Sequence, residues 1–323
     1  VRAAVLAACA QIPGVTACFD KAGNVVATRP GTDASAPTVM LCAHMDEVGL
    51  MVVGATDEGL LQFRALGGID SRVLVSKRVH VGEERLNGVI GAMAIHQQTA
   101  EDRKHVLPIS QLYVDIGAKG KDEALKNAPE GTYITFATKY EEFGQGMALA
   151  KALDDRVGVF NLLRVLEGTY PCTIHCVFTN QEEVGCRGAT GAAHRLQPDI
   201  ALILEGTTAN DSGDSPEVAK VCRCGQGVAV SFMDNSSIAR PAFFRHMLAL
   251  AKEKGITAQV KMSVSGGNEG GVTQRAGSGV KTLVLSVPCR YIHSPSTVCA
   301  LADVEAQRDL ACAFLSQTDF TEL

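Results

Sequence analysis

Apolar and polar residues follow three different patterns along the chain. In the first part, residues 1–12 have helical spacing and end at Pro13–Gly14, and 15–19 with 25–28 alternate as the two arms of a hairpin. Residues 38–43 are then apolar without interruption, which is typical of a strand covered on both faces. This part therefore predicts a helix, a hairpin and a buried strand.

From about residue 48 to residue 143 the pattern changes to short alternating runs separated by glycine-containing turns. The runs are 60–66, 73–81, 89–95, 113–116 and 133–137. Such runs indicate an all-β unit. Since the acid and histidine clusters lie on both sides of it, we expect a small β-barrel inserted into an α/β domain, with the two ends of the insertion close together.

After residue 148 strands and helices alternate. Val157, Phe160, Leu163 and Leu166 have helical spacing, residues 173–178 and 200–204 read as buried strands, and 241–254 as a helix that begins with proline. We expect 282–287 to be the last strand and Asp303 to cap a final helix over 304–315. The chain is thus predicted to be an α/β protein with a mixed sheet between helical layers.

Composition narrows the class of protein. A chain of 323 residues that is 46% apolar suffices for about two domains. The net charge of −5 and the absence of tryptophan argue against nucleic acid as a partner. No apolar run approaches the roughly 18 residues that span a bilayer, so we expect no membrane segment.

The 11 cysteines are scattered singly, which favours buried thiols over disulfides and predicts a reducing, cytoplasmic location. Residues 1–8 resemble a signal peptide only weakly. We interpret them as part of the first helix of a chain whose true N-terminus is absent.

Polar clusters follow the predicted strands at once. His44 and Asp46 follow 38–43, Glu182 and Glu183 follow the strand at 173–178, Glu205 follows 200–204, and His293 comes shortly after 282–287. In open α/β sheets the ligand site lies beyond the carboxyl ends of the strands. We therefore expect these side chains to meet in one crevice, together with Asp154 at the start of a helix.

Two imidazoles and several carboxylates suit two divalent metal ions, with zinc favoured and cobalt or manganese as alternatives. We interpret Asp154 as a bridge between the ions. Neighbouring side chains diverge at a strand end, so Glu183 is expected to bind metal while Glu182 faces the attacking water as general base. Asp46, two residues after His44, is expected to orient its ring.

Each cluster also has a plainer interpretation. Asp154–Asp155 could be the acidic first turn of a helix, and Glu182–Glu183 could be a solvated turn. A single histidine or acid is more often solvated than functional. Their joint recurrence at strand ends is what favours a metal site.

Five ordered motifs, spread over nearly the whole chain, resemble the signatures of the tetrahedral (TET) dinuclear metallo-aminopeptidases, also labelled glutamyl aminopeptidases or endoglucanases. The motifs are 43–49 (AHMDEVG), 152–158 (ALDDRVG), 181–185 (QEEVG), 205–209 (EGTTA) and 290–295 (RYIHSP). The resemblance implies a sandwich of the zinc-exopeptidase type. It also implies that Asp154 bridges the metals, that His44 and Glu205 complete one site and Glu183 and His293 the other, and that Glu182 is the base.

The same resemblance implies the domain organisation and the partners. Residues 1–48 and 145–323 would form the catalytic domain, and 49–144 the inserted dimerisation domain. Twelve subunits, built from dimers, would form a hollow tetrahedron that admits short peptides. This chain departs from the family pattern at Glu205, where the family usually has Asp, and at Gly266–Gly270, where the family usually reads Gly-Gly-Thr-Asp-Ala.

The leading functional hypothesis is a metal-dependent aminopeptidase acting on short peptides. A deacylase or carboxypeptidase on the same dinuclear scaffold and a non-catalytic, metal-stabilised shell protein are the alternatives. A glycosidase is disfavoured because it would need two carboxylates about a sugar bond and no metal. The sequence leaves the preferred side chain and the native metal open.

Overall fold

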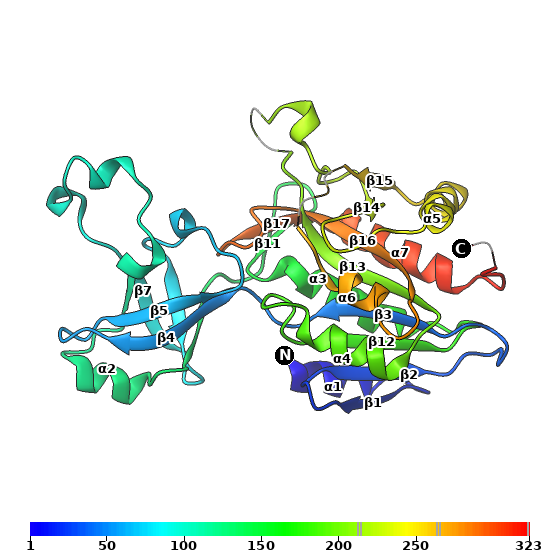
Figure 1. Cartoon of the computed structure of the whole chain (residues 1–323), viewed down its shortest axis with the longest axis horizontal. Helices are drawn as coiled ribbons and strands as arrows, with labels where there is room; N and C mark the ends of the chain where they lie inside the picture. Colours follow the sequence, from blue (N-terminus) through cyan, green and yellow to red (C-terminus); the bar gives the residue numbers. More distant parts are fainter. Residues whose placement is uncertain (212, 214, 263, 265, 322) are drawn as a thin grey trace.

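A computed structural model of the chain describes every residue except Ser212, Asp214, Ser263, Ser265 and Glu322. The side chain of Asp102 is also left undescribed. The chain forms a large α/β part and a small β-barrel that stands beside it (Figure 1). The fold class predicted from the sequence, a mixed-sheet α/β protein with an inserted barrel, is confirmed.

The α/β part is built on an 11-stranded mixed sheet. Four parallel strands form its centre: β12 (Ile174–Thr179), β3 (Val39–His44), β13 (Ile200–Thr208) and β16 (Lys281–Arg290). The strands around them are β1 (Thr16–Phe19), β2 (Val25–Arg29), β10 (Glu141–Phe143), β11 (Met147–Ala150), β14 (Val228–Ser231), β15 (Ala258–Lys261) and β17 (Thr297–Ala300). The order is β1-β2-β12-β3-β13-β16-β17-β11-β10, with β14 paired to β16 and β15 to β14.

Helices cover both faces of this sheet (Figure 1). One face packs against α1 (Arg2–Cys9), α3 (Leu153–Val165), α5 (Pro241–Lys254) and α7 (Leu301–Leu315), and the other against α4 (Arg187–Leu196) and α6 (Glu269–Gln274). Successive residues of a strand point to opposite faces. Leu41 accordingly lies in the first of these cores and Met40 in the second, which explains why β3 is apolar throughout.

The barrel lies between β3 and β10 in the chain and closes in the order β4-β5-β8-β7-β6-β9. Its strands are β4 (Gly49–Ala55), β5 (Leu61–Leu66), β6 (Arg78–Val81), β7 (Leu86–Gly91), β8 (Tyr113–Asp115) and β9 (Tyr133–Phe136), and α2 (Lys121–Asn127) packs at one end. It has an apolar core of its own, which includes Leu50, Leu61, Phe63 and Ile134. A separate core is what allows such an insertion to fold beside its host.

Several boundaries differ from the sequence-based expectation. The segment 282–287 is not the last strand, because β17 follows β16 and runs directly into α7. Asp303 does not cap the last helix, which begins earlier, at Leu301, with Ala300 at the capping position. The buried Asp303 carboxylate instead accepts hydrogen bonds of 2.7 Å from the main-chain amides of Gly225 and Gly227.

In the described part of the chain, no helix combines the length and apolar character needed to cross a bilayer.

Candidate metal centre and active site

The candidate site lies at the carboxyl edge of the central strands. His44 is the last residue of β3 and pairs in register with Thr179, the last residue of β12. The register of β13 against β3 pairs Ile203 with Cys42, so Glu205 aligns with His44 two residues on. Parallel strands end at the same edge of a sheet, and the loops after β12 and β16 therefore bring Glu182, Glu183 and His293 to the same place.

Asp154 reaches this edge from the start of α3. Asp154 and Asp155 have non-helical backbone angles, and the peptide bond between them is cis. Oδ1 of Asp154 lies 3.2 Å from Nε2 of His44, and its Oδ2 lies 3.3 Å from Nε2 of His293. One carboxylate thus touches both imidazoles, one with each oxygen.

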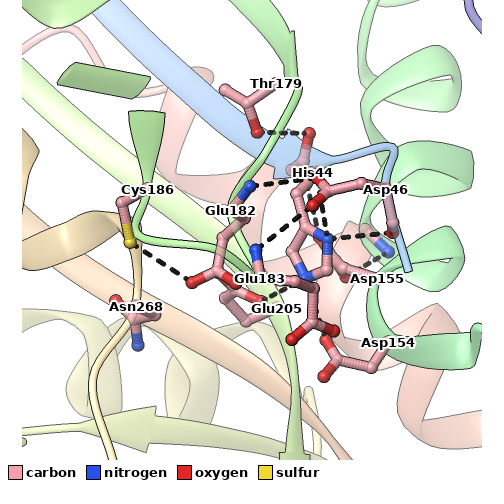
Figure 2. A network of polar contacts seen from close by, with 12 residues as sticks. His44, Asp46, Asp154, Asp155, Thr179, Glu182, Glu183, Cys186, Glu205 and Asn268 are labelled. Carbon is pink, nitrogen blue, oxygen red and sulfur yellow. Dashed lines mark hydrogen bonds and ion pairs between the residues drawn. The ribbon is translucent and has the colours of Figure 1, made fainter. Parts of the chain in front are cut away.

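The residues that the sequence analysis named as metal ligands form two groups that share Asp154. His44, Asp154 and Glu205 make one group, and Asp154, Glu183 and His293 the other. Within each group the ligand atoms all lie within 4.8 Å of one another. At this spacing, one ion could contact all three ligand atoms of a group. Figure 2 shows several of these side chains converging.

Both imidazoles are fixed by hydrogen bonds on their outer nitrogen. Nδ1 of His44 donates to the main-chain oxygen of Asp46 at 3.1 Å, and Nδ1 of His293 donates to the main-chain oxygen of Gly68 at 3.0 Å. A carbonyl can only accept, so both Nδ1 atoms carry the proton and both Nε2 atoms face the carboxylates. Ligating histidines in metal sites are commonly held in this way.

The electrostatics of the site favour cations. Burial and the charge of Asp154 raise the pKa of Glu183 to about 7, and burial with Asp155 nearby raises that of Glu205 well above its usual value. The hydrogen bond that His293 donates to the Asp154 carboxylate raises the pKa of His293 to about 9. Such crowded, buried carboxylates stay ionised only beside positive charge.

A pair of divalent ions fits these residues. Oε1 of Glu205 is buried and has no hydrogen-bond partner among the described residues, so a ligand atom stands ready there. The carboxylates of Asp154, Glu183 and Glu205 carry a charge of −3, against +4 for two divalent ions. Imidazole and carboxylate ligands suit zinc and its neighbours in the first transition series. No thiol belongs to either group.

Glu182 lies beside this centre, in the loop between β12 and α4. Its main-chain amide and that of Glu183 donate to the two carboxylate oxygens of Asp46, at 3.1 and 3.2 Å. Asp46 therefore orients the His44 ring through its main chain and the Glu182–Glu183 loop through its side chain. Oε1 of Glu182 accepts a hydrogen bond of 3.3 Å from the Cys186 thiol (Figure 2).

A cavity of about 380 Å³ opens over the centre. Besides the acids and histidines it is lined by Thr207, Lys261 and Asn268. Lys261 is 7% exposed, and it pairs with no carboxylate in the part of the chain that the structure describes. Sequence reasoning missed Lys261 because it stands at the end of a short edge strand, with no motif around it.

The barrel also contributes to the site. Gly67 and Gly68 follow β5, and Gly67 has a φ of +81°. A Cβ at Gly67 would lie 3.2 Å from Oε2 of Glu183 and 2.9 Å from Val48. Glycine there lets the main chain approach the ligands, and the carbonyl of Gly68 holds His293.

Comparison with known proteins agrees with this geometry. The sequence profile described as M42 glutamyl aminopeptidase matches residues 23–310. The chain belongs to this family. The lysyl aminopeptidase of Pyrococcus furiosus is 31% identical to this M42 chain over 313 residues, which cover 94% of this chain and 88% of the relative.

Solved structures of similar proteins share the whole fold. An aminopeptidase from the archaeon Desulfurococcus kamchatkensis superposes with a TM-score of 0.92 at 31% identity, covering 98% of this M42 chain and 89% of its own. The TET1 peptidase of Pyrococcus horikoshii, which can assemble into a tetrahedron or a large octahedral shell, superposes with a TM-score of 0.83 at 30% identity. That match covers 98% of this chain and 100% of the other.

Proposed function

We propose that this M42 aminopeptidase removes the N-terminal residue from short peptides, using two divalent metal ions and Glu182 as general base. The observation that carries the proposal is the sharing of Asp154 between two ligand groups, with Glu182 beside them. Asp154 would bridge the ions, His44 and Glu205 would complete one site, and Glu183 and His293 the other. Zinc is the favoured ion, with cobalt or manganese as alternatives.

The ions, when bound, would acidify water and polarise the scissile carbonyl. The protein's own part in the reaction is proton transfer and orientation. Glu182 would accept the proton of the attacking water and hand it to the leaving amine. Burial raises the pKa of Glu182, which suits a group that must both take and give a proton. Asp46 holds the loop that carries Glu182, so the base stays in place while it exchanges the proton.

The cavity also supports a substrate preference. The Lys261 ammonium, unpaired with any described carboxylate, lies beside the reaction centre and would attract an acidic N-terminal side chain. The relative from P. furiosus is a lysyl enzyme, so specificity in this family does not follow from overall similarity. We therefore expect glutamyl or aspartyl peptides to be preferred on the basis of Lys261.

The experiment that tests the function compares peptides with free and acetylated N-termini, with metal analysis on the same protein. An aminopeptidase should cleave the free peptide, fail on the blocked one and stop when a chelator removes the ions. Equal cleavage of the blocked peptide would instead identify a deacylase or carboxypeptidase. A protein that binds two ions but cleaves neither peptide would be a non-catalytic shell.

We further propose that residues 49–144 form a dimerisation domain, that 1–48 and 145–323 form the catalytic domain, and that dimers assemble into a tetrahedral dodecamer in the cytoplasm. Support comes from the shells of the P. horikoshii relative and from apolar side chains exposed on the barrel part, including Val53, Met93, Ile95 and Tyr133. Light scattering should give a mass twelve times the 34.0 kDa of one chain. A monomer at all concentrations would exclude the assembly.

A further inference from the structure

Three features near the centre are not used by the proposed reaction: the Cys289–Cys299 pair in register between β16 and β17, the buried Glu269, and the Cys186 thiol. The two cysteines and Glu269 are all fully buried. Only Cys186 makes a direct contact with a reacting group. Its sulfur lies 3.3 Å from Oε1 of Glu182.

We propose that Cys186 is a positioning residue for the general base: its S–H donates to Oε1 of Glu182 and leaves Oε2 to exchange the proton. The inference rests on the proposed role of Glu182. Cys186 is the only described residue that donates a side-chain hydrogen bond to the Glu182 carboxylate. Without it, the carboxylate could rotate about its last side-chain bonds, which are soft.

The thiol is suited to stay a donor. Burial and the neighbouring Glu182 carboxylate raise the pKa of the Cys186 thiol, with Glu269 adding to the effect. A thiol with a raised pKa keeps its proton at neutral pH and is a poor nucleophile. Cys186 therefore serves as an uncharged donor that adds no cation beside the metal ligands.

The backbone places Cys186 independently of its side chain. Its main-chain amide donates to the carbonyl of Glu182 at 2.9 Å, and the amides of Arg187 and Gly188 donate to Gln181 and Asn180. These bonds turn the chain back so that residue 186, at a left-handed φ of +51°, faces residue 182. Replacing the thiol should therefore change one hydrogen bond and leave the loop intact.

The test uses the full-length, metal-loaded protein with Cys186→Ala and Cys186→Ser. Loss of one donor to a charged group should lower kcat about three- to ten-fold at unchanged KM and metal content. The serine hydroxyl should restore kcat to within about two-fold. Cys224→Ala is the matched control, because it removes a thiol bond of the same 3.3 Å length, to the carbonyl of Pro288, away from the base.

A double-mutant comparison separates this inference from the proposed function. In a Glu182→Ala background, Cys186→Ala should cause no further loss, since its acceptor is gone. If Glu182→Ala itself keeps the normal rate, the proposed base is wrong. Two other outcomes would overturn only the role of Cys186, provided that Glu182→Ala is inactive. One is a normal kcat for Cys186→Ala, and the other is an equal fall in kcat for Cys186→Ala and Cys186→Ser.

A second readout does not depend on activity. Alkylation of Cys186 by iodoacetamide, followed by mass spectrometry, should be several-fold faster in Glu182→Gln than in the unaltered protein, since the thiol loses its anionic neighbour. Cys18, which is exposed, serves as the internal reference. Equal rates for Cys186 in the two proteins would contradict the contact.

Discussion

The main-chain amide of His44 donates a hydrogen bond of 3.1 Å to Oδ2 of Asp155. This bond joins the end of β3 to the start of α3 and thereby sets His44 against Asp154, the neighbour of Asp155. Oδ1 of Asp155 also accepts from the amide of Gly158 at 3.0 Å, so its carboxylate is enclosed by main chain. Asp155 thus orients the proposed bridging carboxylate and belongs to neither ligand group.

Gly158→Ala should disturb this arrangement. A Cβ at residue 158 would lie 2.6 Å from both carboxylate oxygens of Asp155 and 2.8 Å from the carbonyl of Leu204. We expect a destabilisation of about 1–3 kcal/mol, as for other overpacked buried sites, and a lower metal content. Thermal unfolding and metal analysis measure the two effects.

Gly191→Ala is the matched control for that substitution. Gly191 lies within α4 and has no atom within 4 Å of an added Cβ. Alanine there should raise the free energy of unfolding by about 0.5–1 kcal/mol, because glycine is the poorer helix former. Equal effects at positions 158 and 191 would show that the enclosure of Asp155 is unimportant.

Glu182→Gln should lower kcat by about two or more orders of magnitude, the scale expected for loss of a positioned proton-transfer group. Both metal ions should remain bound, because Glu182 belongs to neither ligand group. Steady-state kinetics and metal analysis on one preparation provide the check. A normal rate would remove Glu182 from the mechanism.

Metal affinity should rise with pH between about 7 and 9. The hydrogen bond that His293 donates to Asp154 raises the pKa of His293 to about 9, and burial raises that of Glu183 to about 7. Both groups must lose a proton before they bind a cation. Protons therefore compete with the ion below these values, and loading near neutral pH should release protons. Titration of the metal-free protein with zinc against a competing chelator, at several pH values, measures this affinity. An affinity that does not change with pH would contradict the prediction.

Lys261→Glu should shift the preference from acidic to basic N-terminal residues. The change reverses the charge of the lysine that lines the cavity, and it leaves the ligand groups intact. We expect kcat/KM for glutamyl peptides to fall by at least about ten-fold, the scale of a lost charged hydrogen bond, while lysyl peptides gain. Lys261→Met is the control that removes charge at similar length, and it should lose the acidic preference without gaining the basic one.

The sequence predicted the parts of the fold whose signal is local. Largely apolar runs identified β3 and β12 because nearly all residues of those strands are buried, and alternation with glycine turns identified the barrel. The sequence analysis did not predict α4 or β17. α4 buries only small residues such as Gly188 and Ala192, and β17 has only four residues.

The sequence by itself also determined which acids and histidines follow strands, because a polar residue directly after a buried run is visible in one dimension. Only the tertiary structure decided how they meet. The parallel register aligns Glu205 with His44, the barrel carbonyl of Gly68 orients His293, and β15 brings Lys261 into the cavity. These relationships join residues up to 225 positions apart, and their geometry depends on strand pairing and packing that no local pattern encodes.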